Sequence, residues 1–504
     1  MTTNVNFEPT IQLTNTDCKI TGIPISMCSA ISNRLSVKAP NYWFSEKFKC
    51  GMWDGNIKFF KRPQNTFPAG LLPMVLDTLK SDFDITPRIV DLRKGIEGIT
   101  LKTVDYGFKI SDEKTARDYQ VDAVNNIINS KVLDVPFHRC IVNIATNGGK
   151  TSIAIALMKQ LYGSLTKNNK IFLFVTHSQE IAYQAKKSIE GDLKIPVGFI
   201  GDGKWECSNI TVALITTLSR RTKKPEFKEI VDKTIGFVAD ECHHAQSTTW
   251  YDTFNLLHNA SIRIGLTGTI DKTNPVNEMR LYACTGDVIT KVSNDFLIKN
   301  GFSAKPLCIL FTITTPELEE ESYRDAYKLG IIESEERLEV IRDICKKETS
   351  DNNTVLILVE RIEHGQLIYE FLKDLNRNIE FINGTVDSTT RQNMLNNTKN
   401  NNIDVLISTS VLDEGVDISG INAIIYARGM VSSRKLLQGI GRGLRKKSDG
   451  SRLRFYDFID NMHSSLLQHS LNRYHTLKNE KFDIKMIELD KYNSMSWEEV
   501  ENEK

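Results

Sequence analysis

The chain has 504 residues, of which 40% are hydrophobic and 25% charged, and its net charge is +1. This length predicts two to four domains, and the composition is that of a globular protein. The near-neutral charge excludes a bulk basic field, so any nucleic-acid binding must use local patches. No apolar run approaches the length of a membrane span, and the polar start lacks a signal-peptide core.

The nine cysteines are spread singly and form no C-x-x-C pair. This spacing indicates neither a zinc site nor a disulfide framework. We therefore expect a protein without zinc and without a membrane partner. Unpaired cysteines are typical of a reducing compartment, which predicts a cytoplasmic location, or the host cytoplasm if a phage encodes the chain.

The first hundred or so residues differ from the rest of the chain. Short alternating segments predict strands at residues 10–14 and 56–60, and residues 71–80 predict a short helix. A polar connector follows residue 102. We interpret residues 1–106 as a small N-terminal α+β domain that binds DNA. Its removal should leave the nucleotide site complete and the basal ATPase intact, provided that the cut exposes no core, because every ATP motif lies beyond Ala116.

Residues 42–61 interleave aromatic side chains with lysines, and Trp53-Asp54-Gly55 predicts a hairpin turn. Aromatic rings beside cations suit nucleic-acid bases and backbones, which makes Trp53 and Lys58 candidate DNA contacts. A small β-core with solvated lysines explains the same pattern equally well. The sequence leaves both interpretations open.

From Arg117 onward, apolar strands alternate with helical patterns, which is typical of parallel α/β layers. The predicted strands fall into two series, and each series predicts one lobe: residues 112–297 and residues 298–504. The first series lies at residues 140–144, 171–176, 210–215, 235–239 and 263–266. The second lies at residues 307–313, 355–359, 380–383, 405–408, 423–426 and 453–458.

Residues 144–152 read I-A-T-N-G-G-K-T-S between a predicted strand and a helix at residues 152–161 that Gly163 is expected to end. Strand, Gly-rich turn, Gly-Lys-Thr and helix form the context of a phosphate-binding loop. Lys150 can reach the β- and γ-phosphates of a nucleotide, and the Thr151 hydroxyl can bind Mg²⁺. The alternative is a strand–turn–helix with an exposed lysine.

Residues 234–244 read T-I-G-F-V-A-D-E-C-H-H, an apolar strand that ends in two carboxylates. Asp240 can hold Mg²⁺ through water, and Glu241 can polarise the attacking water, which are the two functions that phosphoryl transfer requires. His243 and His244 are adjacent, so their side chains project apart, and no third ligand has the spacing of a zinc site.

Residues 437–447 read L-Q-G-I-G-R-G-L-R-K-K. Arg442 and Arg445 lie three residues apart, so a helix would place them on one face. Arginine suits the charge that develops on a γ-phosphoryl group. A solvated basic helix is the alternative, but a phosphate loop and a carboxylate pair elsewhere in the chain favour two arginine fingers.

Taken in order, these motifs resemble those of the superfamily 2 helicases of the DExH type. The resemblance spans residues 116–460 and implies an α/β fold with two tandem RecA-like parallel-sheet lobes, behind a small α+β N-terminal domain. It implies ATP and Mg²⁺ as cofactors, with ATP between the lobes. Residues 117–120, R-D-Y-Q, resemble the adenine-reading motif, in which Gln120 bonds the adenine edge and Arg117 or Tyr119 stacks on it.

The remaining residue assignments are also those that the resemblance implies. Motif I adds the nucleotide-binding residues Thr146, Asn147, Gly148 and Gly149, and motif V adds Gly415 and Asp417. The catalytic residues are Glu241, His243, Gln438, Arg442 and Arg445, and the metal ligands are Thr151 and Asp240. The nucleic-acid contacts of the motor are Thr176, Gln184, Thr217, Arg361 and Thr409. Residues 266–269, L-T-G-T, resemble motif III, which links hydrolysis to strand movement in this family.

Residues 42–72 and 297–301 resemble a bacteriophage recombination helicase of this family. That likeness implies an ATP-dependent DNA helicase or translocase whose partner is branched DNA. The expected reactions are fork regression, junction branch migration, and R-loop or D-loop unwinding. The alternatives are an RNA helicase with the same motor, the motor of a restriction system, and an ATPase switch that binds without DNA-stimulated turnover.

Overall fold

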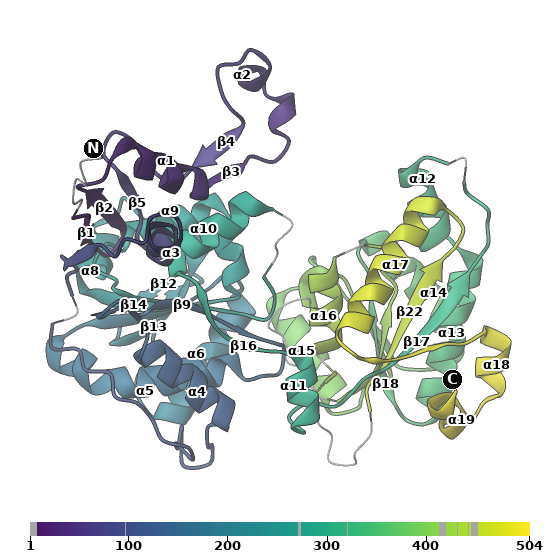
Figure 1. Ribbon diagram of the computed structural model, residues 1–504. Coiled ribbons are helices and arrows are strands. Elements are labelled where there is room, and N and C mark those ends of the chain that lie inside the picture. The colour runs from purple at the N-terminus through teal and green to yellow at the C-terminus, as the bar shows by residue number, and fades with distance from the viewer. Residues whose placement is uncertain are drawn as a thin grey trace. The chain divides into compact units, whose positions relative to one another are not determined.

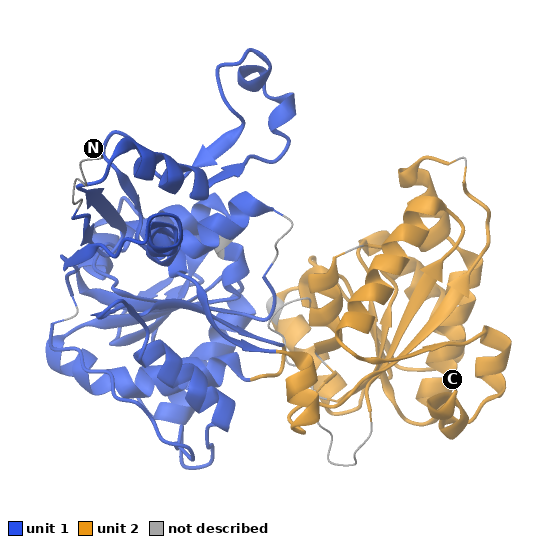
Figure 2. Ribbon diagram, in the orientation of Figure 1, with its two compact units in different colours: residues 1–145, 149–292 blue, residues 146–148, 293–504 orange. Residues whose placement is uncertain are grey.

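The computed structural model describes residues 8–95, 97–270, 274–319, 321–412, 420–430, 432–441, 443–444 and 452–503, without the side chains of residues 245, 246 and 388. The chain divides into two compact units (Figure 2). The first comprises residues 1–145 and 149–292, and the second comprises residues 146–148 and 293–504.

The N-terminal part of the first unit contains a four-stranded sheet of order β5-β2-β1-β6 (Figure 1). Its strands are β1 (Thr10–Leu13), β2 (Asp17–Thr21), β5 (Thr66–Pro68) and β6 (Arg88–Asp91). The helices α1 (Ile25–Arg34) and α3 (Leu72–Phe83) pack on one another, and η2 (Ala69–Leu71) precedes α3. The predicted strand at residues 56–60 is shorter, because β4 (Asn56–Lys58) ends where Phe59 and Phe60 enter the core at 7% and 3% exposure.

This N-terminal part shares its hydrophobic core with the rest of the first unit, residues 112–292, here called the motor part. Ile11, Leu72 and their neighbours form one buried cluster with Phe137 and Met279, which lie in the motor part of the same unit. The buried Arg139 guanidinium donates to the Asn15 carbonyl at 2.7 Å and to the Cys284 carbonyl at 2.8 Å. Because a buried guanidinium must have its N–H groups satisfied, these bonds tie the two parts together.

The motor part of the first unit has an eight-stranded sheet of order β12-β11-β13-β10-β14-β15-β9-β16. Every neighbouring pair is parallel except β11 and β12. The strands are β9 (Arg139–Ile144), β10 (Ile171–Thr176), β11 (Gly198–Gly201), β12 (Lys204–Glu206), β13 (Ile210–Leu214), β14 (Thr234–Asp240), β15 (Ile262–Thr267) and β16 (Val288–Val292).

Helices cover both faces of this sheet, with α4, α5 and α6 on one side and α9 and α10 on the other (Figure 1). The helices are α4 (Asp118–Ile128), α5 (Lys150–Asn168), α6 (Gln179–Leu193), α7 (Ile215–Arg220), α8 (Pro225–Lys233), α9 (Thr248–Leu256) and α10 (Pro275–Thr285), with the 3-10 turn η3 (Cys242–Gln246). A sheet buried on both faces explains why its central strands are continuous apolar runs.

Helix α5 is longer than the sequence predicts. It does not end at Gly163 but continues to Asn168. A glycine inside a helix costs only about 1 kcal/mol relative to alanine. The buried Leu161 and Leu165 on either side of Gly163 outweigh that cost by packing into the core. The helix ends where Asn169 adopts a left-handed backbone at φ 50°.

The second unit has a seven-stranded sheet of order β19-β20-β18-β21-β22-β17-β23, parallel throughout. Its strands are β17 (Leu307–Ile313), β18 (Thr354–Leu358), β19 (Ile379–Ile382), β20 (Val405–Ser408), β21 (Ile421–Tyr426), β22 (Arg454–Asp460) and β23 (Asp483–Met486). Alternate residues of one strand enter opposite cores, with Ile309 and Phe311 in one cluster and Cys308 and Leu310 in the other.

The helices of the second unit lie on both faces of its sheet (Figure 1). They are α11 (Asn294–Lys299), α12 (Tyr323–Tyr327), α13 (Glu335–Ser350), α14 (Ile362–Leu372), α15 (Ser388–Lys399), α16 (Ser433–Gly441), α17 (Ser464–Asn479), α18 (Leu489–Ser494) and α19 (Trp497–Asn502), with the short turns η4 (Lys328–Ile332), η5 (Lys373–Leu375) and η6 (Ser410–Leu412). The two tandem parallel-sheet lobes that the sequence predicts are confirmed.

Candidate nucleotide and nucleic-acid sites

The strand order of the first unit gathers the predicted motifs at one edge of its sheet. Strands β10, β14, β15 and β9 are consecutive neighbours and parallel. Their carboxyl ends therefore meet at the same edge, where ligands bind in open α/β sheets. Asp240 ends β14, Thr267 ends β15, and the phosphate loop follows β9.

The phosphate loop turns sharply between β9 and α5. Asn147 and Gly149 have left-handed backbones at φ 69° and 77°. The left-handed backbone favours glycine at position 149, and a Cβ atom there would lie 2.4 Å from the Gln120 side-chain nitrogen, which would have to move. The structure thus brings Gln120 of the predicted adenine motif directly against the phosphate loop, from which it is separated by about 30 residues of sequence.

The adenine motif begins helix α4. The Arg117 backbone N–H donates to the Gln120 side-chain oxygen at 3.0 Å, and the Arg117 guanidinium donates to the Tyr119 hydroxyl at 2.9 Å. Tyr119 is only 6% exposed, whereas Arg117 is partly exposed. Of the two predicted stacking residues, Arg117 is therefore the one with surface to offer to a base.

Lys150 and the two carboxylates form a coupled cluster. The Lys150 ammonium donates to the Glu241 carboxylate, and both side chains are largely buried, at 14% and 15% exposure. Burial opposes the Lys150 charge, but Glu241 and Asp240 outweigh it, so the pKa of Lys150 is raised. Burial, reinforced by the Glu241 charge and opposed by Lys150, raises the pKa of Asp240 to about 6.

The residues present fit a divalent cation. Asp240 is 7% exposed, and its Oδ1 atom has no hydrogen-bond partner among the described residues. A buried carboxylate oxygen normally has a partner, and Mg²⁺ is commonly bound by one or two carboxylates with a substrate phosphate. Asp240 and Thr151 would hold the ion, which would neutralise charge on the phosphates.

Glu241 is held by its neighbours in an unusual conformation. Its backbone is left-handed at φ 47°, which is uncommon for a residue other than glycine. The His243 ring nitrogen Nδ1 lies 3.4 Å from the Glu241 carboxylate and 3.1 Å from the Thr267 hydroxyl. Because the Thr267 hydroxyl donates to the Thr269 carbonyl at 2.7 Å, it accepts from His243, which fixes the proton on Nδ1.

Sequence reasoning assigned no function to His177, which the structure places in this cluster. Its ring centroid lies 4.1 Å from that of His244, and His244 lies 4.3 Å from His243. His177 directly follows β10, the strand beside β14. A histidine immediately after a central parallel strand is the sequence signal that could have identified it.

The predicted nucleic-acid contacts of the motor differ in accessibility. Thr176 and Thr409, each next to a strand end, are buried at 0% and 5% exposure. Thr217 on α7 is partly exposed, and Gln184 on α6 is exposed. The Arg361 guanidinium is 47% exposed beside Glu363 at 3.1 Å.

The two N-terminal candidates contact a local turn at residues 53–56, in which the Asn56 N–H donates to the Asp54 carboxylate at 2.9 Å. This is not the hairpin turn that the sequence predicts, because β4 pairs with residues 36–38 and the whole segment 39–55 connects the two strands. The Trp53 indole N–H donates to the Asn56 carbonyl at 2.8 Å. The Lys58 ammonium pairs with the Asp54 carboxylate at 2.7 Å. Both contacts lie within six residues of sequence, so they stabilise the turn locally.

Besides Arg361, Thr409 and residues 146–148 of the phosphate loop, the second unit contributes the described motif residue Gln438, on helix α16. Its side-chain oxygen is buried and has no hydrogen-bond partner in the described part of the chain. The other predicted residues of this unit's motifs lie outside the described residues: Arg442, Arg445, Gly415 and Asp417.

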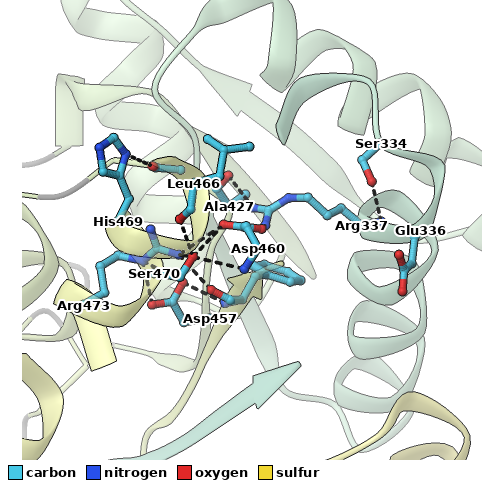
Figure 3. A network of polar contacts seen from close by, with 12 residues as sticks. Ser334, Glu336, Arg337, Ala427, Asp457, Asp460, Leu466, His469, Ser470 and Arg473 are labelled. Atoms are coloured by element: carbon cyan, nitrogen blue, oxygen red, sulfur yellow. Dashed lines mark hydrogen bonds and ion pairs between the residues drawn. The ribbon is translucent and has the colours of Figure 1, made fainter. Parts of the chain in front are cut away.

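A buried ionic network holds the segment that leads into α16 (Figure 3). Arg337 on α13 pairs with Asp460 at the end of β22, and both are at most 1% exposed. Arg473 on α17 pairs with Asp457 at 2.9 Å and with Asp460 at 3.4 Å. The Ser470 hydroxyl donates to Asp460 at 3.1 Å. The two aspartates thus supply the counter-charges of two fully buried guanidinium groups, although the Arg337 Nε atom has no hydrogen-bond partner among the described residues.

The same side chains bond the backbone between β21 and α16. Arg337 donates to the Ala427 carbonyl at 2.9 Å, and Arg473 donates to the Met430 carbonyl at 3.4 Å. The His469 ring nitrogen lies 3.2 Å from the Gly429 carbonyl (Figure 3). Side chains from two other helices therefore fix the path of the chain just before α16. No pattern in the sequence predicts this network.

No group of three or more histidine, cysteine or acidic side chains with metal-binding geometry occurs in the described part of the chain. The described helices also include none with the length and apolar character needed to cross a membrane.

Comparisons with known proteins agree with the motifs. Residues 113–272 match the family described as type III restriction enzyme, res subunit, and residues 336–447 match the helicase conserved C-terminal domain. The chain is 27% identical over 369 residues to IRC3 of Saccharomyces cerevisiae, a protein assigned as an ATP-dependent helicase; the alignment covers 68% of this chain and 51% of that protein.

A second relative is similar over nearly its whole length. The chain is 24% identical over 489 residues to the ATP-dependent DNA helicase uvsW of Enterobacteria phage T4, covering 90% of this chain and 93% of that protein. Thus the chain spans about half of the yeast relative and most of the phage one. The solved structure of the DUF1998 helicase MrfA bound to DNA shares the fold, with a TM-score of 0.56 at 13% identity, covering 82% of this chain and 56% of that chain.

Proposed function

Because this chain belongs to superfamily 2 of the helicases and is an ATP-hydrolysing enzyme, we propose that it translocates on DNA and remodels branched structures in recombination and repair. The observation that carries the proposal is the cluster of Lys150, Asp240 and Glu241 at one sheet edge. The near full-length similarity to a phage enzyme named as an ATP-dependent DNA helicase supports DNA as the substrate.

The nucleotide site is proposed to work as follows. The loop from Thr146 to Gly149 cradles the phosphates with backbone N–H groups, and Lys150 binds the β- and γ-phosphates. When phosphate arrives, Lys150 has an alternative to its bond with Glu241, and Glu241 is released to polarise the attacking water. Gln120 bonds the adenine edge, and Arg117 stacks on the base.

His243 is proposed as the connection between hydrolysis and DNA movement. It contacts Glu241 on one side and the Thr267 hydroxyl on the other. A change in the position of Glu241 during hydrolysis would therefore reach the end of β15 through one imidazole ring. The motif resemblance alone supports the remaining assignments in the second unit. We propose that Gln438, Arg442 and Arg445 take part in ATP hydrolysis and that Gly415 and Asp417 bind the nucleotide.

Of the DNA contacts, Gln184, Thr217 and Arg361 are accessible and are proposed to bind phosphates, which positions the strand without reading its sequence. Thr176 and Thr409 are proposed to act through the backbone N–H groups beside them, since their side chains are buried. An RNA helicase and the motor of a restriction system are the competing functions, and both would use the same motor.

One experiment separates these functions. The steady-state ATPase rate is measured with single-stranded DNA, linear duplex, a fork, a four-way junction and RNA at equal nucleotide concentration. The proposal expects the strongest stimulation by forks or junctions. Stimulation by RNA alone would establish an RNA helicase, and stimulation by linear duplex equal to that by junctions would favour a restriction-type motor. An unstimulated rate would contradict a translocase altogether.

A further inference from the structure

Residues 36–58 form an arm that extends from the N-terminal part of the first unit (Figure 1). Its stem is the pair of short antiparallel strands β3 (Ser36–Lys38) and β4, in which Lys38 pairs with Asn56. Its tip carries η1 (Tyr42–Phe44) and α2 (Glu46–Lys49). Every residue of the arm except Gly55 is at least partly exposed. Val37 and Ile57 of the stem pack against the N-terminal hydrophobic core, whereas residues 39–55, which include the tip, do not.

Local contacts nevertheless fix the conformation of the tip. The Tyr42 ring packs edge-on against Phe48 with centroids 4.8 Å apart, and the Lys38 ammonium lies 4.7 Å from the centre of the Tyr42 ring. Gly55 has a left-handed backbone at φ 75°, and a Cβ atom there would lie 2.6 Å from Tyr42. The tip is therefore ordered before any partner arrives, which lowers the entropy cost of binding.

Three large apolar side chains at the tip stay exposed, although the Trp43 ring lies edge-on to Tyr42 with centroids 5.2 Å apart. Trp43 is 51% exposed, Phe44 is 70% exposed and Met52 is 76% exposed. Trp43 and Phe44 are adjacent, with ring centroids 5.9 Å apart. Apolar side chains that gather on a projecting element mark a binding surface. Trp53 and Lys58, by contrast, are engaged in the turn itself.

The charge around the tip indicates what it binds. From residue 36 to residue 58 the arm has four basic and two acidic side chains, and Lys61 and Arg62 follow beyond its stem, although the whole chain has a net charge of only +1. Lys47 and Lys49 on α2 are exposed and form no ion pair with any described residue. Exposed rings beside free ammonium groups match unpaired bases beside phosphates.

We propose that the tip of the arm, formed by Trp43, Phe44, Lys47 and Lys49, binds the unpaired bases at a DNA branch point. Trp43 and Phe44 stack on the bases, and the two lysines bind the adjacent phosphates. Stacking needs bases that are not covered by their neighbours, so the tip distinguishes a branch from a continuous duplex. This inference rests on the proposed function and adds the residues that recognise the branch.

The test uses the full chain and a fork with 2-aminopurine at the first unpaired position, followed by fluorescence and by anisotropy. Wild-type protein is expected to quench the 2-aminopurine. The variant Trp43→Ala/Phe44→Ala is expected to lose the quench and about tenfold or more in fork affinity, since stacking contributes about 1–3 kcal/mol per base. Binding to linear duplex and the basal ATPase rate are expected to stay unchanged. Ile25→Ala, an apolar residue 80% exposed outside the arm, is the matched control.

A second variant tests the charges. Lys47→Ala/Lys49→Ala is expected to lose about two phosphate contacts. The slope of log fork affinity against log salt concentration should therefore become shallower by about two units. Wild-type affinity and quench in both variants would overturn the inference and leave a protein partner as the occupant of the tip. If wild-type protein itself bound no DNA and showed no DNA-stimulated ATPase, the proposed function would fail first, so the two failures are distinguishable.

Discussion

The Lys150 ammonium donates to the Glu241 carboxylate, so replacing either residue leaves the other without its partner. Lys150→Ala is expected to lower ATP turnover by orders of magnitude, because the phosphates lose their cation. The protein is expected to stay folded, with a somewhat lower melting temperature because Glu241 is left largely buried without its partner. ATPase assays and circular dichroism measure the two effects. Lys167→Ala, an exposed lysine on the same helix, is the control; wild-type turnover in Lys150→Ala would refute the assignment.

Glu241→Gln tests the opposite half of this pair. The amide keeps the size of the side chain and Asp240 is untouched, so ATP binding should survive. Turnover is expected to fall by about 10²–10⁴-fold, the usual contribution of a general base. A fluorescent nucleotide titration beside the ATPase assay separates binding from hydrolysis. An equal loss of nucleotide affinity and turnover would show that Glu241 binds the nucleotide rather than activating water.

The raised pKa of Asp240 predicts how the stability of the protein depends on pH. Its pKa is raised from 3.8 to about 6, chiefly by burial, so the folded state binds the proton more tightly than the unfolded state. The buried carboxylate therefore costs no stability below about pH 4, costs progressively more as the pH rises toward 6, and costs a constant amount above that. Asp240→Asn removes this cost. It should melt at a higher temperature than wild type at pH 7.5 and with a smaller difference at pH 4.5, while losing ATPase activity. If the difference in melting temperature between Asp240→Asn and wild type were the same at both pH values, the carboxylate would not be a buried charge.

At the scale of the element, the sequence predicts the central strands well. Strands β10 and β17 have the predicted limits, because a parallel strand buried on both faces is a continuous apolar run. Strand β11 was not predicted although it is buried, because two of its four residues are glycines and it forms no apolar run. Strands β12, β16 and β23 were not predicted either. Each is only partly buried, and β12 and β23 have no fully buried residue, so their residues give no such run.

The residues of the candidate site likewise divide into those that local sequence identifies and those that it does not. The motif residues of the first unit could be identified from local sequence, since Lys150, Asp240 and Glu241 lie at or just beyond the ends of predicted strands and the R-D-Y-Q segment is a local motif of its own. Contacts that join distant segments could not. The His243–Thr267 bond spans 24 residues, and the Arg337–Asp460 pair spans 123. Only the order of strands in the sheet brings such residues together, and the apolar pattern does not encode that order.

The buried network gives a prediction for the second unit. Asp460→Asn leaves Arg337 and Arg473 without one of their two counter-charges inside the core. Breaking one partner of a buried pair costs about 3–5 kcal/mol, because the remaining charge stays buried. The unfolding midpoint in urea is expected to fall accordingly. Asp483→Asn is the control, since Asp483 pairs with Arg452 at 2.8 Å but is 30% exposed, and such a pair contributes under about 1 kcal/mol. Equal effects of the two substitutions would show that the network adds no stability.

At the scale of the whole molecule, the N-terminal residues serve two purposes that the sequence did not separate. Residues 8–95 complete a core with Phe137 and Met279 and cap the Arg139 guanidinium through Asn15. Residues 39–55 of the arm, by contrast, lie outside every buried cluster of the described residues, whereas Val37 and Ile57 of its stem pack against the N-terminal one. The expectation that residues 1–106 can be removed without harm to the nucleotide site is therefore revised: the cut would expose apolar core beside β9, the strand that leads into the phosphate loop.

Two deletions distinguish these purposes. Removing residues 1–106 is expected to lower the melting temperature sharply or to cause aggregation, because Phe137 and Met279 become exposed and the buried Arg139 loses an acceptor. Removing only residues 39–55 and joining Lys38 to Asn56 through Asn-Gly keeps the strand pairing of the stem, since Asn-Gly suits a two-residue hairpin turn. That variant should melt like wild type, retain basal ATPase activity, and lose fork binding. Thermal denaturation, ATPase rate and fork anisotropy are measured on both. Full stability of the larger deletion would show that the shared core contributes nothing, and a marked loss of stability in the smaller one would show that the arm belongs to the fold rather than to DNA recognition.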